Sequence, residues 1–289
     1  VTRRMNLVLE RMPELGSLGW KALSSLRRKP KPAVELPRMS VSLQGVRFDP
    51  QRLRAYRDIC GFPESGAVPM AYPQVHAIGL QMHLLTQPQF PLPLIGLVHL
   101  KNRVVQEREL APDETLGMTV ALVGDQTTER GREFDLQTTC TDGSGRTVWT
   151  GVATVLYRVA RPGDKKRKGA PPEAESRLAE YREIEAPVDI GRRYGRIAGD
   201  MNPIHLYPLT AKLLGFERHI AHGMWTLARS CALVQPQLGR APRELTAQFR
   251  QPLFLPGRAA LRYGPEGEGY AFTLIGRDSG KTHLNGDLR

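Results

Sequence analysis

The chain has 289 residues, 40% of them apolar, which is enough for one large domain or two ordinary ones with a real core. Its 41 Lys and Arg against 29 Asp and Glu give a net charge of +12, which favours anionic partners such as nucleic acid, a membrane surface or coenzyme A. Three cysteines without a Cys-x-x-Cys spacing argue against a disulfide framework and a thiolate metal site, so a reducing, cytoplasmic setting is expected.

Residues 1–38 form a basic segment, in which nine Lys or Arg stand against three Glu. Because this segment carries part of the excess charge, and because no helix-turn-helix, zinc-finger or aromatic RNA-binding signature occurs, nucleic acid is not an expected partner. The apolar residues from Leu7 to Leu26 have an amphipathic pattern with two readings. The segment is a helix packed on its own domain or on a partner subunit or a partly ordered tail, or it lies on a membrane face.

No apolar run of the sequence reaches the roughly 20 residues that span a bilayer. Charges also interrupt the start of the chain, where a signal peptide needs an apolar core. A soluble protein without stable membrane insertion is therefore expected.

Two similar halves follow, at residues 39–160 and 176–289, separated by a linker at 161–175 that is rich in Pro, Gly and charge. Strands are predicted at 98–105, 116–123, 134–140 and 148–157, and again at 244–253, 259–263, 271–275 and from 283 onward. One helix precedes each set, at 76–86 and at 223–234, and the second is apolar nearly all round, as buried helices are. The pattern predicts an α+β fold in which an antiparallel sheet wraps one buried helix, twice.

The run Gly199-Asp200-Met201-Asn202-Pro203-Ile204-His205 concentrates polar and rigid residues. Asn202-Pro203 breaks regular structure, and the resulting turn can bring the Asp200 carboxyl and the His205 imidazole to one small volume, where a single water could bridge them. That geometry suits proton transfer in both directions. The same residues also make a good Asx-turn and helix cap. A metal site is disfavoured, because no third ligand stands at a recognisable spacing.

This run resembles the signature of the MaoC-like, or type 2 (R)-specific, enoyl-CoA hydratases, in which an aromatic residue precedes Gly-Asp-x-Asn-Pro-x-His. The matching residues are Tyr194, Gly199, Asp200, Asn202, Pro203 and His205. His222-Gly223-Met224 also resembles the start of that family's central hot dog helix. The resemblance extends to individual residues over 185–289. The first half matches only in the order of its predicted helix and strands, because no second copy of the motif occurs there. It implies a double hot dog fold, two antiparallel sheets each wrapping a central helix and packed as a pseudo-dimer, with a non-catalytic first half.

The resemblance further implies reversible hydration and dehydration of trans-2-enoyl and (3R)-hydroxyacyl thioesters, carried on coenzyme A or acyl carrier protein, without a further cofactor or metal. Asp200 and His205 would then be the acid/base pair, with His205 activating water and Asp200 handling the C2 proton. The Gly223 N–H, at the positive end of its helix, would hold the thioester oxyanion. The remaining site residues would be Asn202, orienting the loop or the substrate, with Tyr194 and His222 lining the site.

Two rival functions are a hot dog thioesterase and a non-catalytic acyl-thioester-binding protein. The motif with its following His-Gly disfavours the first, and retention of both Asp200 and His205 disfavours the second. The degenerate first half favours medium or long acyl groups, and a homodimer is compatible with the sequence. Candidates for contact with coenzyme A phosphates are Arg196, Lys212 and Arg218. The histidines without a partnered motif are predicted to be packing or surface residues: His76, His83, His99, His219 and His283.

Overall fold

The computed structural model describes residues 4–28, 35–94, 96–158 and 178–289. The linker predicted at 161–175 lies outside these ranges, so its boundaries stay a prediction. None of the helices in the described ranges has the length and apolar content required to cross a bilayer.

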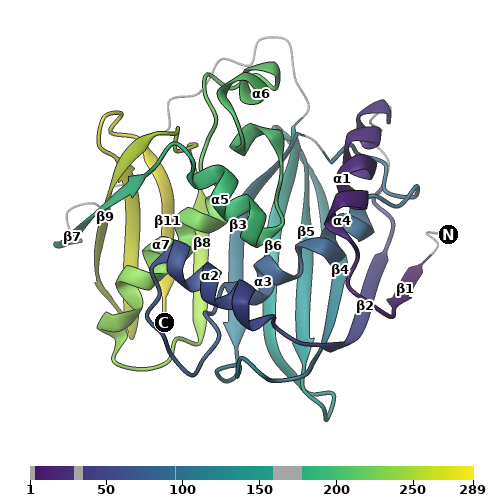
Figure 1. Cartoon of the computed structure of the whole chain (residues 1–289), viewed down its shortest axis with the longest axis horizontal. Coiled ribbons are helices and arrows are strands. Elements are labelled where there is room, and N and C mark those ends of the chain that lie inside the picture. Colours follow the sequence, from purple (N-terminus) through teal and green to yellow (C-terminus); the bar gives the residue numbers. More distant parts are fainter. Residues whose placement is uncertain (1–3, 29–34, 95, 159–177) are drawn as a thin grey trace.

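The strands of the described ranges join into one large sheet (Figure 1). Those of the first half are β1 (Met5–Leu9), β2 (Met39–Val46), β3 (Leu97–Gln106), β4 (Leu116–Thr128), β5 (Gly131–Thr141) and β6 (Thr147–Arg158). Those of the second half are β7 (Glu180–Ala186), β8 (Glu244–Phe249), β9 (Gly257–Glu266), β10 (Gly269–Gly276) and β11 (Thr282–Leu288). The spatial order is β1-β2-β4-β5-β6-β3-β8-β11-β10-β9-β7, and every pair is antiparallel except β1 with β2. All eight predicted strands are present, which confirms the predicted repeat.

The two half-sheets meet edge to edge at β3 and β8, where Lys101 pairs with Gln248 and Val105 pairs with Glu244. Each half thus contributes its own antiparallel sheet, with helices on one face (Figure 1). The expected α+β pseudo-dimer is confirmed, and its two sheets are continuous through this joint.

The helices are α1 (Leu15–Ser24), α2 (Pro50–Cys60), α3 (Tyr72–His76), α4 (Ile78–Leu85), α5 (Ile190–Ala198), α6 (Pro208–Leu213) and α7 (Gly223–Val234), with short 3-10 turns η1 (Ser25–Arg27), η3 (Pro203–His205) and η4 (Gln235–Leu238). α7 has the predicted bounds and is buried on most sides, as its apolar composition requires. The helix predicted at 76–86 is present as α4, at 78–85, and the short helix α3, which was not predicted, precedes it. The two are separated at Ala77, where ψ is −3°.

The basic N-terminal segment packs on its own domain. Its first apolar residues form β1, whose side chains alternate between half-buried and exposed, and which extends the sheet beside β2. Arg28 donates hydrogen bonds to the carbonyls of Leu85 at 3.0 Å and Thr86 at 2.6 Å, at the end of α4. A guanidinium there satisfies carbonyls that the helix leaves without partners.

α2 and α5, neither of which is predicted from the sequence, lie together over the sheet beside α7 (Figure 1). α2 begins with an Asp49 cap and Pro50, and buries Leu53, Tyr56 and Cys60. This layer brings α2 of the first half against the helix that ends at the run 199–205 of the second half.

Candidate active site

The Asp200 loop is built by helix-end and turn chemistry. Gly199, with φ +83°, ends α5 in the left-handed conformation that glycine adopts without strain. The Asp200 Oδ1 then accepts a hydrogen bond from the Asn202 N–H at 3.2 Å, and the Asn202 Oδ1 accepts one from the Ile204 N–H at 3.3 Å. These are the Asx-turns that the sequence suggests as an alternative to function. Here they shape the loop that holds Asp200 and His205, so the two readings are compatible.

Three side chains converge at this loop: Asp200, His205 and His222. The rings of His205 and His222 are stacked, with centroids 3.7 Å apart and an interplanar angle of 24°. The His222 Nε2 lies 3.0 Å from the Asp200 backbone carbonyl and 3.9 Å from its Oδ2. The structure therefore brings together the predicted acid/base residues Asp200 and His205 and places the predicted lining residue His222 in contact with both.

Hydrogen bonds to backbone carbonyls define the tautomers of both rings. His205 Nδ1 lies 2.8 Å from the Ile220 carbonyl, which can only accept, so Nδ1 carries the proton and the Nε2 of the neutral ring keeps its lone pair. By the same reasoning His222 donates from Nε2 to the Asp200 carbonyl. His222 thus holds the Asp200 backbone, while His205 offers an unprotonated Nε2.

Burial and mutual charge set the protonation states. Burial, helped by the neighbouring His222, lowers the pKa of His205 to about 3, although Asp200 opposes this. Burial also lowers the pKa of His222. For Asp200 burial raises the pKa, but His222 and His205 act against it and the net pKa lies below its ordinary value. At neutral pH the site holds neutral imidazoles beside an ionised carboxylate that is 39% exposed, against 7% for His205.

Two glycines on one face of α5 let this helix touch the loop directly. A Cβ on Gly191 would lie 2.0 Å from the His205 carbonyl oxygen, and one on Gly195 would lie 2.7 Å from the Asp200 carbonyl oxygen. Positions four apart share a helix face, so both contacts come from the same side. The backbones of Asp200 and His205 are therefore seated on α5.

Gly223 begins α7, with His222 as the residue before it. The first N–H groups of a helix have no acceptor within the helix, and they lie at the positive end of its dipole. A Cβ on Gly223 would lie 2.9 Å from the Phe249 ring. Glycine at this position thus accommodates the Phe249 ring.

The predicted lining residue Tyr194 is buried, and its ring centroid lies 5.1 Å from that of His222. Its hydroxyl has no hydrogen-bond partner among the described residues. Tyr194 therefore packs against His222 and supports it through ring contact.

His99 of β3 is a neighbour of the site that the sequence does not reveal. Its ring centroid lies 4.7 Å from that of Phe249, the residue that borders Gly223. Its Nε2 is buried without a partner in the described ranges. Burial lowers the pKa of His99 to about 4, opposed by a backbone hydrogen bond to Lys101 and by the charge of Asp200. No local pattern could reveal this residue, because the contact forms across the joint between the halves.

The other predicted residues lie elsewhere. His219 and His283 are buried and bonded to backbone carbonyls, as expected for packing residues. Arg196, Lys212 and Arg218 are exposed, so their contact with coenzyme A phosphates stays a prediction.

The possible ligand atoms of Asp200, His205 and His222 lie within 4.8 Å of one another, so the fold supplies a third candidate ligand that the sequence spacing does not show. Zinc requires three or four such atoms at about 2.0–2.2 Å. His205 Nδ1 and His222 Nε2 are bonded to backbone carbonyls, which leaves His205 Nε2 and His222 Nδ1 as the nitrogens that could bind a metal. The expectation that the site works without a metal stays a prediction.

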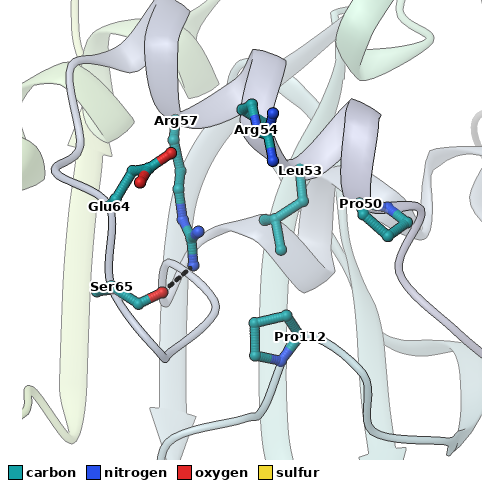
Figure 2. Close-up of a pocket in the computed structure, with 7 residues that line it drawn as sticks. All are labelled: Pro50, Leu53, Arg54, Arg57, Glu64, Ser65 and Pro112. Carbon is teal, nitrogen blue, oxygen red and sulfur yellow. Dashed lines mark hydrogen bonds between the residues drawn. The ribbon is translucent and has the colours of Figure 1, made fainter.

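A hollow of about 480 Å³ on the first half is separate from these residues (Figure 2). It is lined from α2 by Pro50, Leu53, Arg54 and Arg57, and from loops by Glu64, Ser65 and Pro112. None of the predicted site residues borders it.

Comparisons with known proteins agree with this geometry. A family model described as MaoC like domain matches residues 168–273. The chain is 33% identical over 264 residues to 3-hydroxyacyl-thioester dehydratase X of Mycobacterium tuberculosis, an alignment that covers 88% of this chain and 90% of that protein.

Solved structures extend the likeness to the whole fold. The crystal structure of HtdX from Mycobacterium tuberculosis matches with a TM-score of 0.75 and 28% identity, over 86% of this chain and 99% of that one. A second protein of that organism, described as having a double hot dog fold, matches with a TM-score of 0.55 over 86% of this chain and 94% of its own. Its 14% identity bears on the fold alone. The chain belongs to the MaoC-like dehydratase family and has a double hot dog fold.

Proposed function

We propose that this protein, a hydro-lyase by its family, interconverts trans-2-enoyl and (3R)-hydroxyacyl thioesters with Asp200 and His205 as its acid/base pair. The observation that carries the proposal is the neutral His205, with the lone pair of Nε2 free, in the same loop as an ionised and partly exposed Asp200. Such a pair can pass one proton between a water oxygen and a carbon without ending in a different charge state.

In the hydration direction, His205 Nε2 accepts a proton from water as the water oxygen bonds to C3. The electrons of the double bond move toward the thioester carbonyl, and C2 then takes a proton delivered through Asp200, which has received it from His205. One water is consumed, one proton moves from oxygen to C2, and the enzyme returns to neutral His205 and ionised Asp200. Dehydration runs these steps in reverse.

Charge that develops on the thioester oxygen needs a donor that is in place before the reaction. The Gly223 N–H at the start of α7 is suited to this role, because the helix dipole adds positive potential there. The Asx-turns of Asp200 and Asn202 shape the loop that carries the acid/base pair.

The carrier of the acyl group is coenzyme A or acyl carrier protein, since both present phosphate and the chain has a net charge of +12. Medium or long acyl groups are the proposed substrates. The relative named a 3-hydroxyacyl-thioester dehydratase supports the thioester class. No cofactor beyond the carrier takes part in the proposed steps.

The test is to mix the purified protein with crotonyl-CoA and with a longer trans-2-enoyl-CoA and to follow the enoyl-thioester absorbance, with a thiol reagent in a parallel assay. Loss of absorbance without release of free thiol is the expected result. Release of thiol from either substrate without hydration would refute the proposal and favour a thioesterase.

A further inference from the structure

α2 of the first half is bonded to both catalytic elements of the second half. At one end, Arg52 donates from Nε to the Ile197 carbonyl at 2.6 Å and from Nη2 to the Ala198 carbonyl at 3.0 Å. These are the last two residues of α5, immediately before Gly199 and Asp200. One side chain thus binds the end of the helix from which the Asp200 loop departs.

At its other end, α2 receives two hydrogen bonds from α7. Trp225 donates from Nε1 to the Ile59 carbonyl at 3.0 Å, and Arg229 donates to the Cys60 carbonyl at 3.4 Å. Trp225 lies two positions after Gly223. The helix that begins with Gly223 and the helix that leads into the acid/base loop are therefore both hydrogen-bonded to α2.

The chemistry of Arg52 suits a fixed position. The two carbonyls it binds are among those that a helix leaves without partners at its C-terminus, where the dipole also favours a cation. A planar guanidinium can donate to both at once, which an ammonium on a flexible stem cannot do with the same geometry. Four hydrogen bonds in total tie α2 to α5 and α7.

We propose that Arg52 is a positioning residue of the active site, and that α2 acts as a brace which sets the Asp200 loop relative to Gly223. The first half, which lacks the catalytic motif, thereby contributes to the rate of the reaction as well as to the fold. This inference rests on the proposed function for its kinetic test, but not for its structural one.

The variants are Arg52→Met, which removes the donors, and Arg52→Lys, which keeps the charge. Arg54→Met is the matched control, because Arg54 lies on the same helix but lines the hollow of Figure 2 and, among the described residues, makes no hydrogen bond that joins the halves. Thermal unfolding of each variant identifies any that fail to fold.

Arg52→Met is expected to lower kcat by about tenfold or more with KM nearly unchanged, since displacement of about 1 Å can cost about 10²-fold in rate. Arg52→Lys is expected to fall between Arg52→Met and wild type, and Arg54→Met to match wild type. The pH profile should keep its midpoints, because Arg52 acts through position and not through the pKa values of the pair. Wild-type kcat in folded Arg52→Met, or an equal loss in Arg54→Met, would overturn the brace.

Amide hydrogen exchange of residues 199–206 separates this inference from the proposed function. Faster exchange in Arg52→Met than in Arg54→Met supports the brace whether or not the protein hydrates enoyl thioesters. Equal exchange in both variants overturns it. Absence of hydration by the wild-type protein, in contrast, bears against the proposed function.

Discussion

Gly191→Ala should slow catalysis although glycine has no side chain that could take part in the reaction. The new Cβ would lie 2.0 Å from the His205 carbonyl oxygen, whereas ordinary contact begins at about 3.4 Å. α5 and the η3 turn must then separate by about 1.4 Å, a displacement that costs on the order of 10²-fold in kcat when it moves a catalytic group. Gly195→Ala, at 2.7 Å from the Asp200 carbonyl oxygen, requires about half that movement and should have a smaller effect.

The assay is the initial rate of enoyl-thioester hydration together with a denaturant unfolding curve. Gly→Ala inside a helix ordinarily stabilises by about 0.5–1 kcal/mol, but the overpacked Gly191→Ala should destabilise by about 1–3 kcal/mol. Gly143→Ala is the control, because that glycine is exposed and a Cβ there has nothing within 4 Å. A stabilised Gly191→Ala with wild-type kcat would refute the contact between α5 and the loop as a determinant of the site.

Three further outcomes are expected. Asp200→Asn and His205→Gln should each lower kcat by about 10² or more in a folded protein, and wild-type turnover in either would remove that residue from the mechanism. The free energy of unfolding should fall as pH drops below about 6.5, because the unfolded chain binds protons there that neutral His205, with its pKa of about 3, does not. Urea midpoints that are the same at mildly acidic and neutral pH would contradict this, and His205→Gln should lose less stability on acidification. Dialysis against a chelator should leave activity unchanged, and a loss restored by a divalent cation would show a metal requirement.

Periodicity predicted the sheet well. Strands such as β5 and β6 alternate buried and partly buried side chains over many residues, and α7 is apolar around most of its circumference, so short-range sequence determines them. The turn at Asp142 and the turn at Asp278 also mark the corresponding hairpins of the two halves. Where the apolar signal is strong, local sequence and tertiary structure agree.

Elements rich in charge were not predictable in the same way. α2 contains Arg52, Arg54 and Arg57, and β7 has mostly exposed side chains, so neither carries the apolar period on which the prediction depends. Their positions are set by contacts with distant residues, such as the bonds from Arg52 to the end of α5. Tertiary contacts of this kind leave no local signature.

The residues of the site also fall into a group that the sequence predicts and a group that it does not. Asp200 and His205 were predictable because one short turn holds both, and the turn residues Asn202 and Pro203 stand between them in the sequence. The roles of His222 and Phe249 were not, because a hydrogen bond to the Asp200 carbonyl and packing on Gly223 depend on how α7 and β8 approach the loop. A motif identifies reacting groups, whereas the groups that hold them come from elsewhere in the chain.

The joint between β3 and β8 also affects how this protein can change. In a pair of identical subunits every residue occurs twice, so a substitution that improves a supporting helix is imposed on the catalytic copy as well. Here β3 and β8 belong to unlike halves of one chain, so each residue occurs once and has one set of neighbours. Tyr72 and Gln74 of α3, for example, are buried in the first half, and a substitution there leaves Asp200 and His205 unchanged. The two halves can therefore change independently at separate positions of the same molecule.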